Sequence, residues 1–240
     1  MKTFKITPKR SLAFVSLICA VCLLLSSCLK ENNNANYNPP AALLTVIQAS
    51  PDEPQLDAYL DNDKINVNPL NFGDVIDYLR AYTGVRNANF YNHATMAKVF
   101  SDTISLSQNV AYSLFLANKP TQPEIVLLTD SLIRPNTGAA TVRFINLSPD
   151  APPVSLAIQG VQVLATNIPY KGHTAFLPVT GNLNYTFVVR QGTTNTVLAT
   201  LPNIILNAGS VYTIWFGGLV ASTNSSDQLS ARILTNAVYY

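Results

Sequence analysis

Five carboxylates lie within twelve residues of this sequence, and oxygen ligands at such density could bind calcium. They are Asp52, Glu53, Asp57, Asp61 and Asp63. Calcium takes about six to eight oxygen ligands, and an EF-hand loop supplies them from acids at fixed positions around a glycine. Asp61-Asn62-Asp63 lacks the later acids and the glycine of such a loop. The alternative, which we favour, is a solvated acidic turn without a metal.

Groups suited to catalysis are sparse. His93 and His173 are the two histidines, and neither has a Cys, His or Glu at metal-binding spacing. The sequence has no Gly-x-Ser-x-Gly motif and no glycine-rich phosphate loop. We therefore predict a non-enzyme that uses no cofactor. A hydrolase with a triad assembled from distant residues is the last of the alternatives.

The N-terminus predicts lipid attachment at Cys28. Residues 2–10 carry four basic side chains and residues 12–25 are apolar, which is the layout of a secretory signal peptide. Leu25-Ser26-Ser27-Cys28 resembles the bacterial lipobox, in which the cysteine after two small residues receives the lipid. We expect cleavage between Ser27 and Cys28, and two or three acyl chains would make membrane binding effectively permanent. The alternative is an ordinary secretory signal with a coincidental cysteine.

A late aromatic segment is a candidate ligand platform. Trp215 and Phe216 are adjacent, so a strand would place them on opposite faces. One would then pack in the core, and the other could join Tyr212 on an exposed surface for a glycan or peptide. The alternative is ordinary packing between sheets or against a neighbouring domain.

Composition indicates an all-β protein with no affinity for nucleic acid. The 240 residues include 15 Pro, 11 Tyr and 10 Phe but two Met, and 12% are charged, less than half of the usual share of about 25%. Removing residues 1–27 leaves 11 basic against 13 acidic groups, a net charge of −2. No basic stripe remains that could follow a phosphate backbone.

A turn sequence occurs twice and indicates an internal duplication. Residues 50–54 read SPDEP and residues 148–152 read SPDAP, 98 positions later. Each copy follows an apolar run and precedes an alternating one, and Tyr112 has its counterpart 100 positions on in Tyr212. Proline fixes φ at the second turn position, and the flanking serine and aspartate can bond to backbone amides. The motif residues are Ser50, Pro51, Asp52, Pro54, Ser148, Pro149, Asp150 and Pro152.

Short alternating runs between turns predict two tandem immunoglobulin-like antiparallel β-sandwich domains. In the first domain we expect Leu56, Ala58 and Leu60 to face inward and Asp57 and Tyr59 outward. We place the domains at residues 41–133 and 139–240, after a signal peptide at 1–27 and an Asn-rich spacer at 28–40. Residues 74–82 could form either a helical turn or a strand.

Both copies resemble a known family, domain of unknown function 4397 (DUF4397). Its motif reads Arg-x-x-His-x-Ser-Pro-Asp-Ala-Pro-x-Val-Asp-Val-x-Val-x-Gly, followed later by Ala-Gly-x-x-Tyr-Thr. The second copy matches at Arg143, Ser148, Pro149, Asp150, Ala151, Pro152, Val154, Gly160, Ala208, Gly209, Tyr212 and Thr213; the first at Ser50, Pro51, Asp52, Pro54, Leu56, Asp57, Tyr59 and Tyr112. Gln48 and Asn146 replace the family histidine, Thr45 its arginine and Ser155 its second aspartate. The resemblance implies a surface-associated β-sandwich module and brings no established reaction or ligand.

We therefore expect an envelope lipoprotein of the outer membrane, on its periplasmic or surface-exposed side, with a binding, adhesion or structural role. Its partners would be the membrane, through the lipid on Cys28, and a glycan or an envelope protein. The alternative is a glycan-binding accessory component of a nutrient-uptake system. Asp102-Thr103-Ile104 and Asp130-Ser131-Leu132 resemble triplets that are O-glycosylated in some bacteria, which fits the same compartment.

Overall fold

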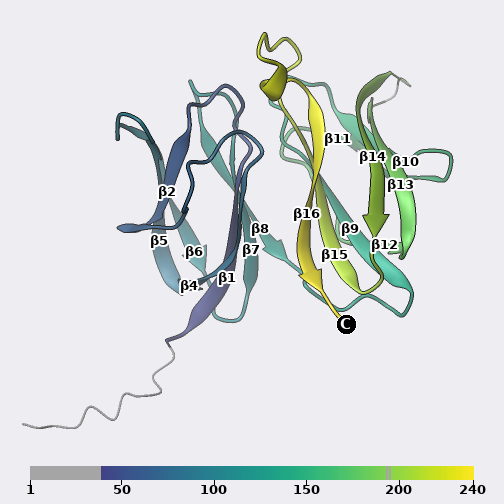
Figure 1. The fold of residues 1–240 in the computed structure, drawn as a ribbon, viewed down its shortest axis with the longest axis horizontal. Helices are drawn as coiled ribbons and strands as arrows, with labels where there is room; N and C mark the ends of the chain where they lie inside the picture. The colour runs from purple at the N-terminus through teal and green to yellow at the C-terminus, as the bar shows by residue number, and fades with distance from the viewer. Residues whose placement is uncertain (1–38, 193, 195) are drawn as a thin grey trace, which may run out of the picture. The chain divides into compact units, whose positions relative to one another are not determined.

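The computed structural model describes residues 39–192, 194 and 196–240. The expected signal peptide, Cys28 and nearly all of the spacer lie outside these residues. Residues 40–240 form one compact unit, whose described part is built from β-strands and includes a short 3-10 turn, η2 (Ser225–Asp227) (Figure 1). Within the described residues, no helix has the length and apolar character needed to cross a membrane.

Among the described residues, sixteen strands make four four-stranded sheets, which form two sandwiches. The first sandwich contains β1 (Ala41–Gln48), β2 (Leu56–Leu60), β3 (Asp63–Lys64), β4 (Val75–Tyr82), β5 (Gly84–Asn92), β6 (Lys98–Leu106), β7 (Ala111–Ala117) and β8 (Glu124–Asp130). The second contains β9 (Ala139–Asn146), β10 (Val154–Ile158), β11 (Gln162–Ile168), β12 (Leu177–Thr180), β13 (Leu183–Gln191), β14 (Val197–Leu206), β15 (Ser210–Gly217) and β16 (Ser230–Val238).

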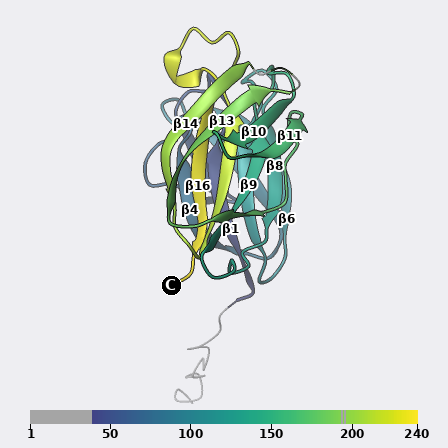
Figure 2. The same cartoon turned by 90° about the vertical axis from the view of Figure 1, so that its right-hand side faces the viewer.

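The two sandwiches share one strand order. The first pairs sheets β4-β1-β7-β8 and β3-β2-β5-β6, and the second pairs β12-β9-β15-β16 and β11-β10-β13-β14. Figure 2 shows the second sandwich from the side of the β11-β10-β13-β14 sheet. Each sandwich has one parallel pair among antiparallel ones: β1 runs with β7 and β9 with β15. Leu43 pairs with Ala111 in the first sandwich, and Thr141 pairs with Val211 in the second. The two pairs are equivalent, because Thr141 lies 98 positions after Leu43 and Val211 lies 100 positions after Ala111.

Each sandwich buries its own apolar core between its two sheets. Leu44, Leu56, Phe90 and Leu114 are fully buried in the first. Val142, Leu156, Phe187 and Ile214 are fully buried in the second. Burying a side chain of this size contributes about 1.5–3 kcal/mol. Alternation along β2 turns Leu56, Ala58 and Leu60 toward the core and leaves Asp57 and Tyr59 on the other side of the sheet.

Residues 75–82, which the sequence allowed as a helical turn or a strand, form edge strand β4, paired with β1. Ala81 of β4 is buried, while Ile76 and Leu79 pack against the same core. A bulge in β1 between Leu44 and Val46 interrupts the register of this pair. The edge position explains the weak alternation of β4, because half of its side chains remain in contact with water.

The repeated turn makes the same side-chain bonds in both sandwiches. Ser50 Oγ donates to Asn118 O at 2.6 Å, and Ser148 Oγ donates to Gly218 O at 2.8 Å. The amides of these serines donate to Gln48 Oε1 and Asn146 Oδ1, at 2.7 and 3.1 Å. Gln48 and Asn146 therefore have the same role: each accepts a hydrogen bond from the amide of the serine two residues later. They stand where the family motif has histidine.

The late tyrosines also match. Tyr112 OH accepts from Ser107 N at 3.2 Å, and Tyr212 OH accepts from Asn207 N at 3.1 Å. Each bond spans five residues and holds the loop that precedes β7 or β15. A tyrosine hydroxyl that bonds back to the upstream backbone is a known way of fixing a sandwich corner.

A third apolar cluster joins the sandwiches through the outer faces of β4-β1-β7-β8 and β12-β9-β15-β16. Ile47, Phe115 and Leu128 supply one side of it, and Ile145 and Trp215 the other. The Trp215 ring packs edge-on against Phe72, with centroids 5.8 Å apart. The outward side chains of the central strands, such as Ile47, Phe115, Ile145 and Trp215, are thereby removed from water.

Candidate functional site

The other outer face of the first sandwich, on sheet β3-β2-β5-β6, carries polar and aromatic side chains. Asp57 and Tyr59 of β2 lie opposite Tyr91 and Asn89 of β5. β3 pairs with the other edge of β2, and Lys64 of β3 lies opposite Tyr59. Because alternate residues of these strands face the core, the outward residues form one continuous surface. We call this surface the polar face.

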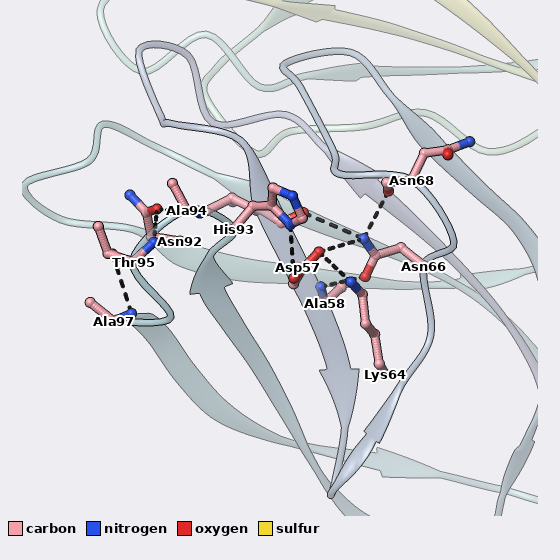
Figure 3. Close-up of polar contacts among 11 residues, drawn as sticks. Asp57, Ala58, Lys64, Asn66, Asn68, Asn92, His93, Ala94, Thr95 and Ala97 are labelled. Atoms are coloured by element: carbon pink, nitrogen blue, oxygen red, sulfur yellow. Dashed lines mark hydrogen bonds and ion pairs between the residues drawn. The ribbon is translucent and has the colours of Figure 1, made fainter.

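Asp57 is the centre of a hydrogen-bonded cluster on the polar face (Figure 3). Asp57 is 2% exposed. Asp57 Oδ1 lies 2.8 Å from Lys64 Nζ and accepts from Asn66 Nδ2 at 3.1 Å, and Asp57 Oδ2 lies 3.1 Å from His93 Nδ1. Asn66 Oδ1 in turn accepts from Ala58 N at 2.8 Å. Both oxygens of the buried carboxylate therefore have polar partners, which offset the cost of removing the charge from water.

These contacts determine the charge of Asp57. Burial alone would raise its pKa, but the hydrogen bonds from Lys64, His93 and Asn66 outweigh burial and lower the pKa to about 2. Asp57 is therefore ionised at any physiological pH. The charge holds the Lys64 and His93 side chains in fixed positions, and the His93 side chain stays 42% exposed at the edge of the face.

An aspartate paired with a histidine is also part of a hydrolytic triad. Within the part of the chain that the structure describes, the His93 ring bonds to Asp57, and no Ser, Thr or Cys side chain bonds to it. A hydrolytic triad would also need a nucleophile bonded to the histidine. In the described structure, Asp57 holds the His93 ring in place at the edge of the polar face.

Two tyrosines and a groove continue the polar face beside this cluster. The Tyr59 and Tyr91 rings pack edge to face, with centroids 5.2 Å apart and planes at 76°. Lys98 Nζ lies 5.6 Å from the centroid of the Tyr91 ring. Next to them is a shallow groove of about 550 Å³ whose lining includes Asp61, Asn62, Arg86, Asn87, Lys98 and Ser101. The lining is polar and suits a ligand rich in hydrogen-bonding groups.

Several of these groups build the groove. Asp61 Oδ2 lies 3.2 Å from Arg86 Nη1, and Asp61 Oδ1 accepts from Asn87 N at 2.9 Å. The Asn89 side chain, almost fully buried, donates to Asp61 O and accepts from Ser101 Oγ at 2.7 Å. The Asn62 and Asn87 residues are exposed at the surface. The groove therefore has a fixed floor and exposed amides at its rim.

The second sandwich lacks this surface at the equivalent positions. Offsets of 98 along β2 and 99 along β5 lead from Asp57 to Ser155, from Tyr59 to Ala157, from Asn89 to Val188 and from Tyr91 to Arg190. The same backbone pairing thus supports a different set of side chains. The fold does not require a carboxylate and two tyrosines here, which makes the polar face a local specialisation of the first sandwich.

The acidic residues that suggested calcium are spread over separate interactions. Asp57 pairs with Lys64, Asp61 pairs with Arg86, and Asp52 Oδ1 accepts from Ser222 Oγ of the second sandwich at 3.3 Å. Among the residues that the structure describes, no three His, Cys, Asp or Glu side chains lie close enough to hold a metal. His93 and His173 lie in different sandwiches.

The aromatic platform predicted at Tyr212, Trp215 and Phe216 is wrong. Their exposed fractions are 5%, 1% and 0%. Tyr212 and Phe216 pack in the core of the second sandwich, and Trp215 packs in the cluster that joins the sandwiches. The alternative of ordinary packing holds for all three, because β15 is a central strand with a covered surface on both sides.

The aspartates of the repeated turn lie where the sandwiches meet. Asp150 Oδ1 accepts from Val220 N at 3.1 Å, and Asp150 Oδ2 lies 3.5 Å from Lys119 Nζ of the first sandwich. Asp52 of the first turn has φ +62° and reaches Ser222, as described above. Both turns therefore contribute a side-chain contact across the interface in addition to reversing the chain.

The two triplets that resemble glycosylation sites differ in their surroundings. Thr103 is exposed on edge strand β6, and Ser131 is exposed in the segment between β8 and β9. Asp130, which precedes Ser131, is buried.

The fold is that of an all-β double-sandwich protein whose first sandwich carries the polar face. A family model, described as domain of unknown function (DUF4397), matches residues 42–157, so the chain contains a DUF4397 domain that begins in β1 and ends in β10. No curated protein sequence matches the chain.

Two solved structures align with most of the chain at low similarity. CBMbc (family CBM26) from Eubacterium rectale Amy13K, in complex with maltoheptaose, is 7% identical, covers 82% of this chain and 97% of its own, and has a TM-score of 0.27. A proposed polysaccharide-binding protein (DUF1812) from Bacteroides thetaiotaomicron VPI-5482 is 11% identical, covers 81% and 96%, and has a TM-score of 0.25. At these scores neither alignment bears on function.

Proposed function

We propose that this chain is a non-catalytic binding protein of the bacterial cell envelope, and that the polar face of its first sandwich binds a glycan. The observation that carries the proposal is the Tyr59–Tyr91 pair beside a polar groove, on a surface that the second sandwich does not reproduce. Glycan binding by an accessory component of nutrient uptake is the role that this surface serves best.

Sugar chemistry matches the two parts of the polar face. The C–H groups on one side of a pyranose ring are apolar and can lie against a tyrosine ring. The hydroxyl groups around the ring need donors and acceptors, which exposed amides such as Asn62 and Asn87 supply. Aromatic side chains give contact area at low entropic cost, so a shallow groove can bind without closing over its ligand.

The membrane anchor is the second part of the proposal. A lipid on Cys28 and the Asn-rich spacer up to Pro40 would hold the sandwiches close to a membrane surface, on the outer membrane of the cell. The Cys28→Ala variant is expected in the soluble fraction after cell lysis. A Cys28→Ala protein that sediments with membranes as the wild type does would refute the anchor.

We further propose that the second sandwich is a second DUF4397 copy. The shared strand order, the two serine bonds and the two tyrosine bonds support this relationship. After duplication, the first copy would keep the ligand surface and the second would serve as a structural partner.

Isothermal titration against a panel of neutral and acidic oligosaccharides tests the glycan proposal. The wild type should bind at least one member, and Tyr91→Ala and Tyr59→Ala should each weaken binding by up to about tenfold, since stacking on one aromatic ring contributes about 0.5–1.5 kcal/mol. Tyr240→Ala is the matched control, because Tyr240 is fully exposed and follows β16 of the second sandwich. Flat titrations across the whole panel would refute the proposal.

A further inference from the structure

We infer that the ligand of the polar face is an acidic saccharide, and that Lys98 binds its carboxylate or sulfate group. This inference rests on the proposed function, and it specifies the substrate class of the same site. The starting observation concerns charge. The described lysines are Lys64, Lys98, Lys119 and Lys171, and three of them pair with a carboxylate. Within the described residues, Lys98 has none within ion-pair distance.

The position of Lys98 places this charge at the ligand surface. Lys98 begins β6 and pairs with Tyr91 of β5, next to a bulge at Phe90 and Tyr91. Its Nζ lies 5.6 Å from the Tyr91 ring centroid, and the residue both lines the groove and is exposed. A sugar ring against the tyrosines would therefore bring its substituents within reach of an ammonium group.

The other charges of the groove cancel one another. Asp61 is neutralised by Arg86 at 3.2 Å. Arg86 also donates from Nε and Nη2 to Tyr82 O and Thr83 O, so its guanidinium is already engaged. Asp102 of β6 lies opposite Ala88, a core residue, and alternation turns it away from the polar face. The groove therefore carries one uncompensated positive charge, that of Lys98.

That local charge contrasts with the rest of the described chain. Residues 39–240 contain 10 basic and 12 acidic side chains, a net charge of −2. A surface of opposite sign on a weakly acidic protein attracts anions selectively. Lys98 makes a compact point charge with three donors, which suits either a carboxylate or a sulfate.

The test compares an acidic oligosaccharide with its neutral counterpart. Oligogalacturonides and the same oligomers with their carboxyl groups reduced to alcohols differ in charge and little else, and a sulfated galactan oligomer gives the second anion. We expect the wild type to bind one or both acidic ligands about fivefold or more tighter than the neutral one at low salt, and the preference should shrink as salt is raised.

Lys98 variants then identify the residue responsible. Lys98→Gln should lose most of the preference for the acidic ligand and keep its affinity for the neutral one, and Lys98→Arg should retain the preference. Lys171→Gln is the control, because it removes one half-exposed lysine charge from the second sandwich.

Two results would overturn the inference and are distinguishable. Equal affinity of the wild type for charged and neutral oligomers, with no effect of Lys98→Gln, would refute the acidic ligand and leave glycan binding standing. Failure of the wild type to bind any of the three ligands, together with a flat glycan panel, would refute glycan binding and the inference with it.

Discussion

Arg143 and Asp130 form a buried ion pair that joins the two sandwiches. Arg143 Nη2 lies 2.7 Å from Asp130 Oδ1, and the two side chains are 3% and 0% exposed. Arg143 belongs to β9 of the second sandwich and Asp130 to β8 of the first. Arg143, which lies five residues before the second repeated turn, therefore acts as a contact between the sandwiches.

Neutral groups from both sandwiches complete this network. Ser113 Oγ donates to Asp130 Oδ2 at 2.8 Å, and Arg143 Nη2 donates to Thr213 Oγ1 at 2.9 Å. Asn236 Nδ2 donates to Tyr78 OH at 2.9 Å, and Tyr78 OH donates to Asp130 Oδ2. Burial and then the Asp130 charge raise the pKa of Tyr78, so its hydroxyl remains a donor. A buried ion pair persists when its remaining donors and acceptors are satisfied in this way.

Loss of one member of the pair should destabilise the protein strongly. Arg143→Ala leaves the Asp130 carboxylate buried without its cation, and such removal costs about 3–5 kcal/mol in the free energy of unfolding. Chemical denaturation measures the change. Arg134→Ala is the control, because Arg134 is an exposed arginine whose bond is to the Tyr240 backbone. The double variant Arg143→Met/Asp130→Leu should recover much of the loss, and no recovery would argue against an uncompensated charge as its cause.

The two tyrosine hydroxyls should contribute equally to stability. Tyr112→Phe and Tyr212→Phe each remove one hydrogen bond to an upstream amide and preserve the packed ring. We expect each to lower the free energy of unfolding by about 1 kcal/mol. Tyr240→Phe should have no effect, since its ring is fully exposed. A large loss in one variant and none in the other would show that the two corners are not equivalent.

Acid should destabilise the protein through Asp57. Its folded pKa of about 2 lies below the ordinary value of 3.8, so its contribution is complete above pH 3.8 and is lost as the pH falls toward 2. The full contribution is about 2 kcal/mol. Thermal unfolding of the wild type and Asp57→Asn between pH 2 and pH 7 measures it. The two proteins should differ near neutrality and converge at low pH, whereas a constant difference would contradict the assignment.

Glu53 should act in the opposite direction. Burial raises its pKa from 4.5 to about 7, so the fold favours the protonated form. The cost of ionising Glu53 is absent below pH 4.5, grows as the pH rises to about 7 and is constant above. Because the side chain is only partly buried, solvent screening limits this cost to on the order of 1 kcal/mol. Glu53→Gln should therefore be more stable than the wild type at pH 8 and equal to it at pH 4, as measured by urea denaturation.

Local patterns were sufficient to predict the all-β class, the facing of β2 and the repeated turns, but they left β4 undecided. Leu56, Ala58 and Leu60 face inward because alternation depends on strand geometry alone, and the two sandwiches share one strand order. The turn at Ser50 and Ser148 follows from the preferences of serine, proline and aspartate for turn positions. These features rest on interactions within a few residues.

Surfaces that depend on distant partners could not be predicted. Trp215 and Arg143 occupy outward positions of their strands, and they are buried because a second sheet covers that side. Nothing near them in sequence shows this cover. The polar face is hidden from the sequence for a related reason: alternation places Tyr59 outward, but its contact with Tyr91 depends on the register between β2 and β5.

Mapping the bound ligand on the protein tests the central claim most directly. A ¹⁵N-labelled sample of residues 40–240 would be titrated with the oligosaccharide that binds most tightly, and amide chemical shifts would be followed by NMR. We predict that the perturbed amides lie in β2, β5 and β6, around Tyr59, Tyr91 and Lys98. Shifts centred on β10, β13 and β14 of the second sandwich would contradict the proposed binding face.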